Sequence, residues 1–216
     1  MIRSLLGSLP GNWSLSAKRF WNSLSGERNM FFFREWTLEP LNFSLSLDEF
    51  TCGHPDLDEF FKQDAFINEQ HLLGKSYFLT RDGYRPGPGY PPIALICFCN
   101  ASIHMAEMET FQKQEGVKYY EYLPAVKIAR LAVLKEFQGS NIGSLVLRMT
   151  KSVFLTQNRT GCRILTVDKY KDDRVVHFYE ENGFARIPET RKEKKNLTWT
   201  MYYDLKRFDP SDGVVC

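Results

Sequence analysis

Hydrophobic and polar positions along residues 128–147 change their period part-way through the segment. An apolar run of strand character begins at Ile128 and ends near Leu134. A polar stretch, residues 138–143, follows it, and apolar residues then recur at helical spacing. The pattern predicts a strand, a glycine-containing turn and a helix in direct succession. Such a turn presents several backbone N–H groups at the positive end of the helix dipole, so it suits a phosphate or pyrophosphate group.

Two further helices are predicted from the remaining pattern. Residues 56–73 carry a helical apolar stripe, and Asp56 followed by Glu59 indicates a capping pair at its start. A second, shorter helix is closed by Asn182 and Gly183, which form a typical C-terminal signal.

Strand patterns alternate with these helices along the chain. We expect strands over residues 31–38, from residue 77 onward, and over residues 93–103, 128–133, 161–168 and 198–205. This order of elements predicts a mixed sheet of the α/β or α+β class with helices on its faces.

Length and composition indicate one globular domain of 216 residues, and a net charge of +2 gives no overall attraction to nucleic acid. We divide the chain into an N-terminal extension that is flexible or not native (1–30), the domain (31–208) and a C-terminal tail (209–216). The five cysteines are an odd number without a Cys-x-x-Cys pair, which favours reduced thiols in a cytoplasmic protein. No segment is long and apolar enough to predict a membrane span, and no cluster has metal-ligand spacing.

The turn after the strand at 128–133 resembles the acyl-CoA-binding motif of the GNAT superfamily of N-acetyltransferases. That motif reads Arg or Gln, two residues, Gly, one residue, then Gly or Ala. Gln138, Asn141 and Gly143 occupy these three positions. Asn141 stands where the family has glycine, and Asn is the non-glycine residue that best tolerates a positive φ angle.

A second segment, residues 161–184, resembles the next core motif of the same superfamily. A strand is followed by a helix that ends in Phe178-Tyr179, three residues and Gly183-Phe184. The two motifs follow in the family's order and together cover residues 125–187. The resemblance implies the GNAT fold, in which two central strands splay apart and hold the pantetheine arm of acetyl-CoA.

A narrower likeness lies at residues 50–60, which read Phe-x-Cys-Gly-x-x-x-Leu-Asp-x-Phe. This stretch is similar to the N-terminal region of a GNAT subgroup that contains tRNA-acetylating toxins of bacterial toxin–antitoxin pairs.

The resemblance implies acetyl-CoA as co-substrate and assigns two parts of the chain to it. The strand backbone would pair with the pantetheine arm, and the turn would hold the pyrophosphate. The strand residues are Leu131, Ala132 and Val133, and the turn residues are Gln138, Gly139, Ser140, Asn141, Ile142, Gly143 and Ser144.

Tyr179 is the predicted general acid, because the family places a tyrosine of this motif near the cofactor sulfur. A phenol with a pKa near ~10 is protonated at neutral pH and can donate to a thiolate. Glu121 is the predicted base, with Glu107 and Glu109 as rivals, and a neutral acceptor amine would need no base at all.

The acceptor stays open between three hypotheses. The first is a small or protein amine that is acetylated in a ternary complex. The second is aminoacyl-tRNA, for which Arg186, residues 191–195, Arg130 and Arg148 are candidate phosphate contacts. The third is a non-catalytic acyl-CoA-binding or interaction module. We expect no membrane partner, and a homodimer is compatible with the family.

Overall fold

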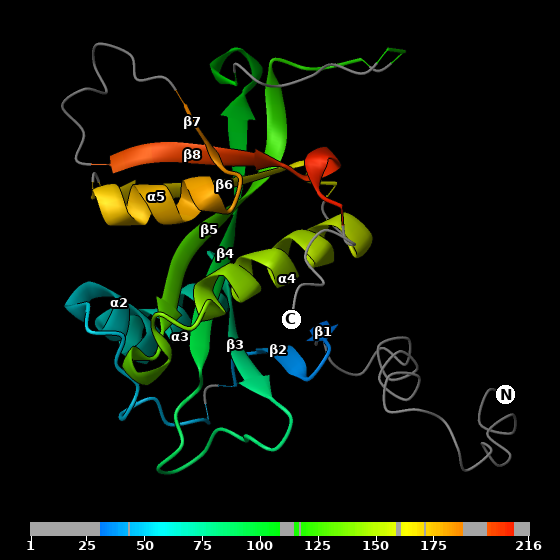
Figure 1. Ribbon diagram of the computed structural model, residues 1–216. Helices are drawn as coiled ribbons and strands as arrows, with labels where there is room; N and C mark the ends of the chain where they lie inside the picture. The colour runs from blue at the N-terminus through cyan, green and yellow to red at the C-terminus, as the bar shows by residue number, and fades with distance from the viewer. Residues whose placement is uncertain are drawn as a thin grey trace, which may run out of the picture.

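The structure is a computed structural model that describes residues 31–42, 44–108, 115–116, 118–158, 161–170, 172–187 and 198–209. The predicted extension at 1–30, Glu109, the basic run at 191–195 and most of the C-terminal tail lie outside these residues. The described chain forms one mixed sheet flanked by helices (Figure 1), as the sequence predicted.

The sheet has eight strands in the order β1-β2-β3-β4-β5-β6-β8-β7. The strands are β1 (Phe31–Phe33), β2 (Trp36–Pro40), β3 (Lys75–Arg81), β4 (Ala94–His104), β5 (Tyr122–Val133), β6 (Ile164–Tyr170), β7 (Ala185–Arg186) and β8 (Thr198–Asp204). All neighbours are antiparallel except β5 and β6. The parallel pair requires a crossover, and the α4 helix supplies it.

The first predicted strand, residues 31–38, is a hairpin instead. Its turn lies at Arg34, which adopts a φ of 54°, and Phe33 pairs with Trp36 across it. The polar pair Arg34-Glu35 marks the turn only weakly, because it carries no glycine or proline signal.

Strands β5 and β6 part beyond Ile128. Their pairing runs from Ala125 with Ile164 to Ile128 with Val167 and then ends, although both strands continue. The edge of β5 that faces β6 is therefore without a strand partner from residue 129 to 133 within the described chain. This is the splay that the family resemblance implied.

One extra residue in β5 accompanies the splay. Cys97 pairs with Arg130 but Phe98 pairs with Ile128, so Ala129 is a β-bulge. The alternation of side chains is inverted across it: Ile128 packs into the core beneath α4, whereas Ala132 packs into the core on the opposite face.

Helices cover both faces of the sheet. The α4 helix (Ile142–Thr156) and the α5 helix (Asp173–Glu181) bury Val146, Leu147 and Tyr179 in the same core, and Figure 1 shows α4 crossing in front of the strands. The opposite face receives the segment from residue 55 to 70, which buries Phe61 and Ala65.

The predicted helix at 56–73 is three consecutive segments. They are α2 (Pro55–Glu59), a π-helical turn η2 (Phe60–Asp64) and α3 (Ala65–Gln70). The expected capping pair of Asp56 and Glu59 is not formed, because His54 is the N-cap residue and its side chain makes no capping hydrogen bond. Asp58 instead accepts hydrogen bonds from Cys52 N at 2.8 Å and from Thr51 Oγ1 at 2.7 Å, so it fixes the loop before α2. None of the described helices has the length and apolar character needed to cross a membrane.

Candidate active site

The turn between β5 and α4 has the backbone form that the sequence predicted. Gly139 has a φ of 78° and Asn141 a φ of 60°, so Asn141 adopts the left-handed conformation in place of the family's glycine. The short 3₁₀ turn η4 (Lys135–Phe137) precedes them. No atom lies within 4 Å of a β-carbon built at Gly139, which leaves room for a ligand to approach the backbone.

Backbone N–H groups converge at the start of α4. The first hydrogen bond of the helix runs from Leu145 N to Asn141 O at 3.0 Å. The N–H groups of Ile142, Gly143 and Ser144 precede that bond and point out of the helix end, where the helix dipole adds partial positive charge. The arrangement is suited to an anion.

Gln138 fixes the turn to its surroundings through its side chain. Its Nε2 donates to Cys52 O at 2.7 Å and to Val133 O at 3.0 Å. The amide therefore joins the turn, the end of β5 and the loop before α2, and its nitrogen is committed to protein carbonyls. The backbone of Gln138 is the part that stays a candidate for ligand contact.

The α5 helix touches the same turn. A β-carbon at Gly143 would lie 3.0 Å from Phe178 Cζ, so the ring of Phe178 packs directly on this glycine. Asp172 caps the start of α5 by accepting a hydrogen bond from Arg174 N at 2.9 Å. At its other end, Asn182 Nδ2 donates to Ser144 Oγ at 3.0 Å. The two motifs thus form one packed unit.

Tyr179 lies inside this unit and is 6% exposed. Its ring packs against Phe178, with centroids 5.0 Å apart, and against Phe184 at 5.4 Å. Burial raises the pKa of Tyr179 above its ordinary value, because the charged phenolate is disfavoured away from water. No described residue hydrogen-bonds to its hydroxyl. The side chain is therefore a neutral phenol that can donate a proton.

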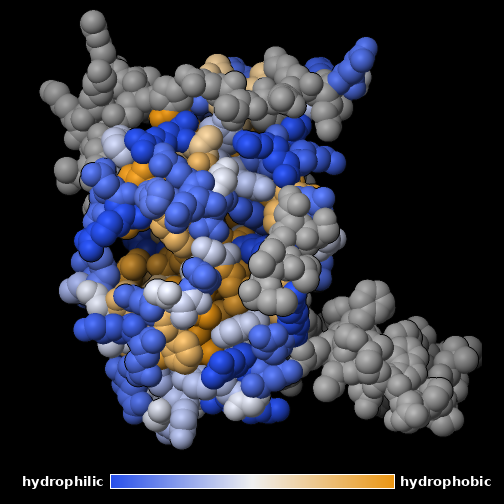
Figure 2. Space-filling view, viewed as in Figure 1, coloured by the Kyte–Doolittle hydropathy of each residue, from blue (hydrophilic) through white to orange (hydrophobic). Residues whose placement is uncertain are grey.

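The backbone of Leu131–Val133 borders the splay. One edge of this segment pairs with β4, where Ala94 lies opposite Val133, and the other edge faces the gap toward β6. Figure 2 shows an apolar depression on this face, between α5 and α2 and next to the start of α4. The predicted pantetheine-pairing segment and the predicted pyrophosphate turn are therefore continuous with each other.

Glu121 is not brought to this place. It is 72% exposed and its Oε1 lies 2.9 Å from His104 Nε2. The first six residues of β5 separate it from Ile128, where the strands part, which is roughly 20 Å of strand. Glu107 lies near the same remote end, in η3 (Met105–Glu107). The structure therefore gives neither carboxylate a position beside Tyr179.

Asp168 lies closer to the splay than these glutamates. It accepts from Lys127 Nζ at 2.5 Å and from Thr200 Oγ1 at 2.7 Å, and it thereby bridges β5, β6 and β8 on the sheet face opposite α4. Asp168 is thus within β6 and has a cross-strand role.

One family model matches the middle of the chain. Residues 100–186 match the family model of the acetyltransferase (GNAT) domain. This segment is similar to a GNAT domain. It runs from β4 to β7 and contains the turn, α4, the splay and α5. No curated protein matches the chain in sequence.

Solved structures extend the similarity of the GNAT domain to the whole fold. The protein AtaT complexed with acetyl-methionyl-tRNAfMet is 20% identical, with a TM-score of 0.65, over 79% of this chain and 95% of AtaT. A tyrosine-to-phenylalanine mutant of KacT is 19% identical, with a TM-score of 0.64, over 80% and 96% of the two chains. A structure named bacterial toxin is 14% identical, with a TM-score of 0.64, over 79% and 91%. The GNAT fold predicted from the sequence is confirmed.

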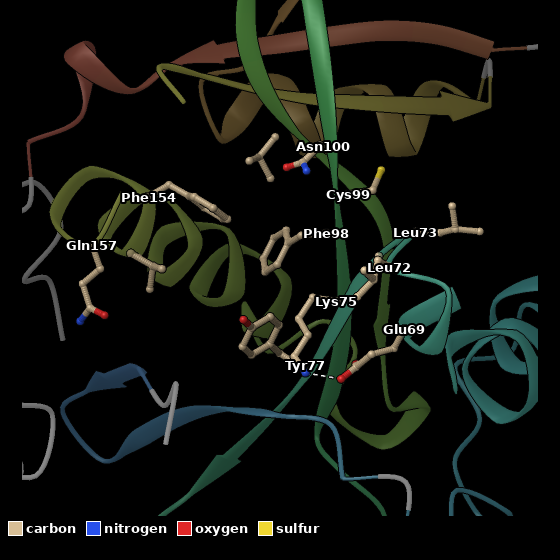
Figure 3. A pocket seen from close by; sticks show the side chains of 13 residues that line it. Glu69, Leu72, Leu73, Lys75, Tyr77, Phe98, Cys99, Asn100, Phe154 and Gln157 are labelled. Atoms are coloured by element: carbon tan, nitrogen blue, oxygen red, sulfur yellow. Dashed lines mark hydrogen bonds and ion pairs between the residues drawn. The ribbon is translucent and has the colours of Figure 1, made fainter. Parts of the chain in front are cut away.

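A separate apolar pocket of about 470 Å³ lies by the C-terminal half of α4 (Figure 3). Tyr77, Phe98 and Phe154 line it, and the ion pair of Lys75 with Glu69 stands at its edge. It shares no residue with the 138–144 turn or with α5, so it is distinct from the candidate active site.

Proposed function

We propose that the chain is an acetyl-CoA-dependent N-acetyltransferase that acts on a primary amine. The observation that carries the proposal is the packing of Gly143 against Phe178, which joins an anion-binding turn to a buried, neutral Tyr179 in one unit. A structure of AtaTR bound with AcCoA, 21% identical and with a TM-score of 0.60, supports the choice of cofactor.

The chain's own groups fit acetyl-CoA in two places. The N–H groups at the start of α4 and the open space at Gly139 suit a pyrophosphate. The free edge of β5 at residues 131–133 suits an amide-bearing arm that adds to the sheet as a strand does. When bound, the cofactor supplies an acetyl thioester.

Tyr179 is the proposed general acid. Its Oη carries a proton throughout the physiological pH range, and this proton is suited to a leaving thiolate. Since neither Glu121 nor Glu107 lies beside Tyr179, we propose that the acceptor amine reaches the site in its neutral form or loses its proton to water.

Aminoacyl-tRNA is a second candidate acceptor. The structure of AtaT with acetyl-methionyl-tRNAfMet favours it, together with the likeness at residues 50–60. Among the described basic candidates, Arg186 is held by Glu180 at 2.6 Å and lies over the ring of Trp199. Arg130 lies over the ring of Phe60. Any tRNA surface would therefore draw on stacked arginines and on residues 191–195.

Calorimetry with acetyl-CoA tests the proposal directly. The variant Gly139→Asp places a carboxylate where phosphate would approach, and no atom obstructs the new side chain. Gly83→Asp is the matched control, because Gly83 also has a φ of 78° and an open surrounding. We expect binding by the native chain and by the control, and its loss in Gly139→Asp. Absence of binding by the folded native chain would favour the non-catalytic interaction module.

An acceptor screen completes the test. Charged tRNA, small amines and protein amines are offered with labelled acetyl-CoA to the native chain and to Tyr179→Phe. Transfer that depends on Tyr179 identifies the acceptor, and binding of acetyl-CoA without transfer to any amine would contradict the enzymatic proposal.

A further inference from the structure

The side-chain amide of Asn182 connects the first turn of α4 with the last turn of α5. Its Nδ2 donates to Phe178 O at 2.8 Å and to Ser144 Oγ at 3.0 Å. A carbonyl oxygen only accepts hydrogen bonds, so the atom beside Phe178 O must be the amide nitrogen. An amide nitrogen only donates, so Ser144 Oγ must be the acceptor of its second N–H. The direction of this hydrogen bond is thereby fixed.

The O–H of Ser144 is left to donate elsewhere. Other hydroxyls of α4 donate to the carbonyl four residues before them: Thr150 to Val146 and Thr156 to Ser152, each at 2.8 Å. Ser144 makes no such bond, and within the described chain its hydroxyl has no acceptor. The Ser144 O–H can therefore donate a hydrogen bond to a ligand oxygen, and it lies among the free N–H groups at the start of α4.

The surroundings of Ser144 favour an anion as that acceptor. Ser144 and Asn182 line a cavity of about 690 Å³ beside the start of α4. Lys151, which is 6% exposed, donates to Asn182 O at 2.5 Å and holds that residue's backbone in place. The charged residues of the wall are four cations and three acids, namely Arg34, Arg148, Lys151, Arg207, Glu35, Glu181 and Asp209.

We propose that Asn182 is a positioning residue for the cofactor: by occupying Ser144 Oγ as an acceptor, it keeps the Ser144 hydroxyl available as a donor to a phosphate group of acetyl-CoA. The inference rests on the proposed function. It distinguishes Asn from Asp at this position, because a carboxylate would accept the Ser144 proton itself and would add negative charge beside the phosphate site.

The test is a double-mutant cycle of acetyl-CoA binding with Asn182→Ala, Ser144→Ala and the pair. Each single change should weaken binding about ten- to hundredfold, as expected for loss of a hydrogen bond to a charged group. The double variant should bind no more weakly than Ser144→Ala, because Asn182 acts through that hydroxyl. Additive losses, or normal binding by Asn182→Ala, would overturn the inference.

Asn182→Asp provides a second test that keeps the size of the side chain. We expect a loss of acetyl-CoA affinity of about tenfold or more, and unchanged binding of S-acetylpantetheine, which lacks the phosphates, measured by ligand-observed NMR. Asn100→Asp adds the same charge in the separate apolar pocket and should leave acetyl-CoA binding unchanged. Equal losses for both ligands would mean a merely structural role and would refute the proposal.

Inorganic pyrophosphate separates this inference from the proposed function. A native chain that binds pyrophosphate but not acetyl-CoA overturns the proposed function, and the Asn182 and Ser144 variants are then measured with pyrophosphate, where the same pattern is expected. A native chain that binds neither ligand overturns both proposals.

Discussion

The ring of Phe178 lies so close to Gly143 that a β-carbon at position 143 would come within 3.0 Å of Phe178 Cζ. The packing of α5 thus requires a glycine at this motif position. Gly143 is helical, so alanine would gain up to about 1 kcal/mol in helix propensity, whereas forcing the ring aside costs about 1–3 kcal/mol.

Gly143→Ala should therefore lower the free energy of unfolding by about 1 kcal/mol, measured by urea denaturation. Phe178→Leu in the same chain should remove the contact and with it the penalty of the alanine. If Gly143→Ala is equally destabilising with leucine at position 178, the contact is not the cause.

Tyr179→Phe should separate catalysis from stability. The ring contacts with Phe178 and Phe184 are kept, and the hydroxyl has no hydrogen-bond partner within the described chain. The free energy of unfolding should change by less than about 0.5 kcal/mol. The rate of acetyl transfer should fall about 10²- to 10⁴-fold. A variant with full activity would show that another group protonates the thiolate.

Lys151 should make stability depend on pH between about 8 and 10.5. Burial, with the nearby Arg148 charge, lowers the pKa of Lys151 to about 8 from 10.5. Between these values the unfolded chain holds the proton and the folded chain does not, so stability rises with pH by up to about 1.4 kcal/mol per pH unit.

Denaturation of the native chain and of Lys151→Met at several pH values measures this rise. The stability difference, native minus variant, should be most negative below pH 8 and should increase up to pH 10.5. Lys62→Met, at an exposed site, controls for the loss of one charge. A difference that stays flat over this range would contradict the prediction.

Arg163 and Asp204 form an ion pair, and substitutions of the two residues should have strongly coupled effects on the free energy of unfolding. Arg163 Nε and Nη2 donate to the two Asp204 oxygens at 2.8 and 2.7 Å, and the carboxylate is buried. The pair joins the start of β6 to the end of β8. Arg163→Ala leaves the buried Asp204 carboxylate without its partner and should cost about 3 kcal/mol or more, and Asp204→Ala leaves a half-buried guanidinium and should cost less.

The Arg163 and Asp204 double variant should cost clearly less than the sum of the two single changes, with a coupling of about 1–3 kcal/mol. Urea denaturation of the four proteins gives this cycle. Additive costs would indicate that the two side chains contribute independently.

Local signals made the turn predictable from the sequence. Asn141 is one of the few residue types that adopt a positive φ, and Asn182-Gly183 ends a helix for a similar reason. The alternation of apolar and polar residues in the last strand likewise made β8 predictable. These features depend on a few neighbouring residues, which is why the pattern was sufficient.

Features set by packing between distant segments were not predictable. The π-helical turn at Phe60–Asp64 depends on how α2 meets the sheet. The hydrogen bonds that Asp58 accepts depend on the position of the loop at Thr51. Glu121 precedes the central strand in the sequence, but only the length of β5 shows how far that places it from the splay.

The extra residue at Ala129 makes the count of residues in this part of the chain as important as their identity. Below it, β5 is paired on both edges, so that half cannot slide without breaking two ladders. Above it, the strand runs directly into the turn that meets Phe178. Deleting Ala129 would remove the bulge and leave a regular ladder in which Arg130 to Leu134 keep their faces, whereas deleting a residue after Arg130 would turn the following strand residues toward the opposite helix layer. Insertions and deletions between Leu131 and Gly143 should therefore be tolerated far less than substitutions.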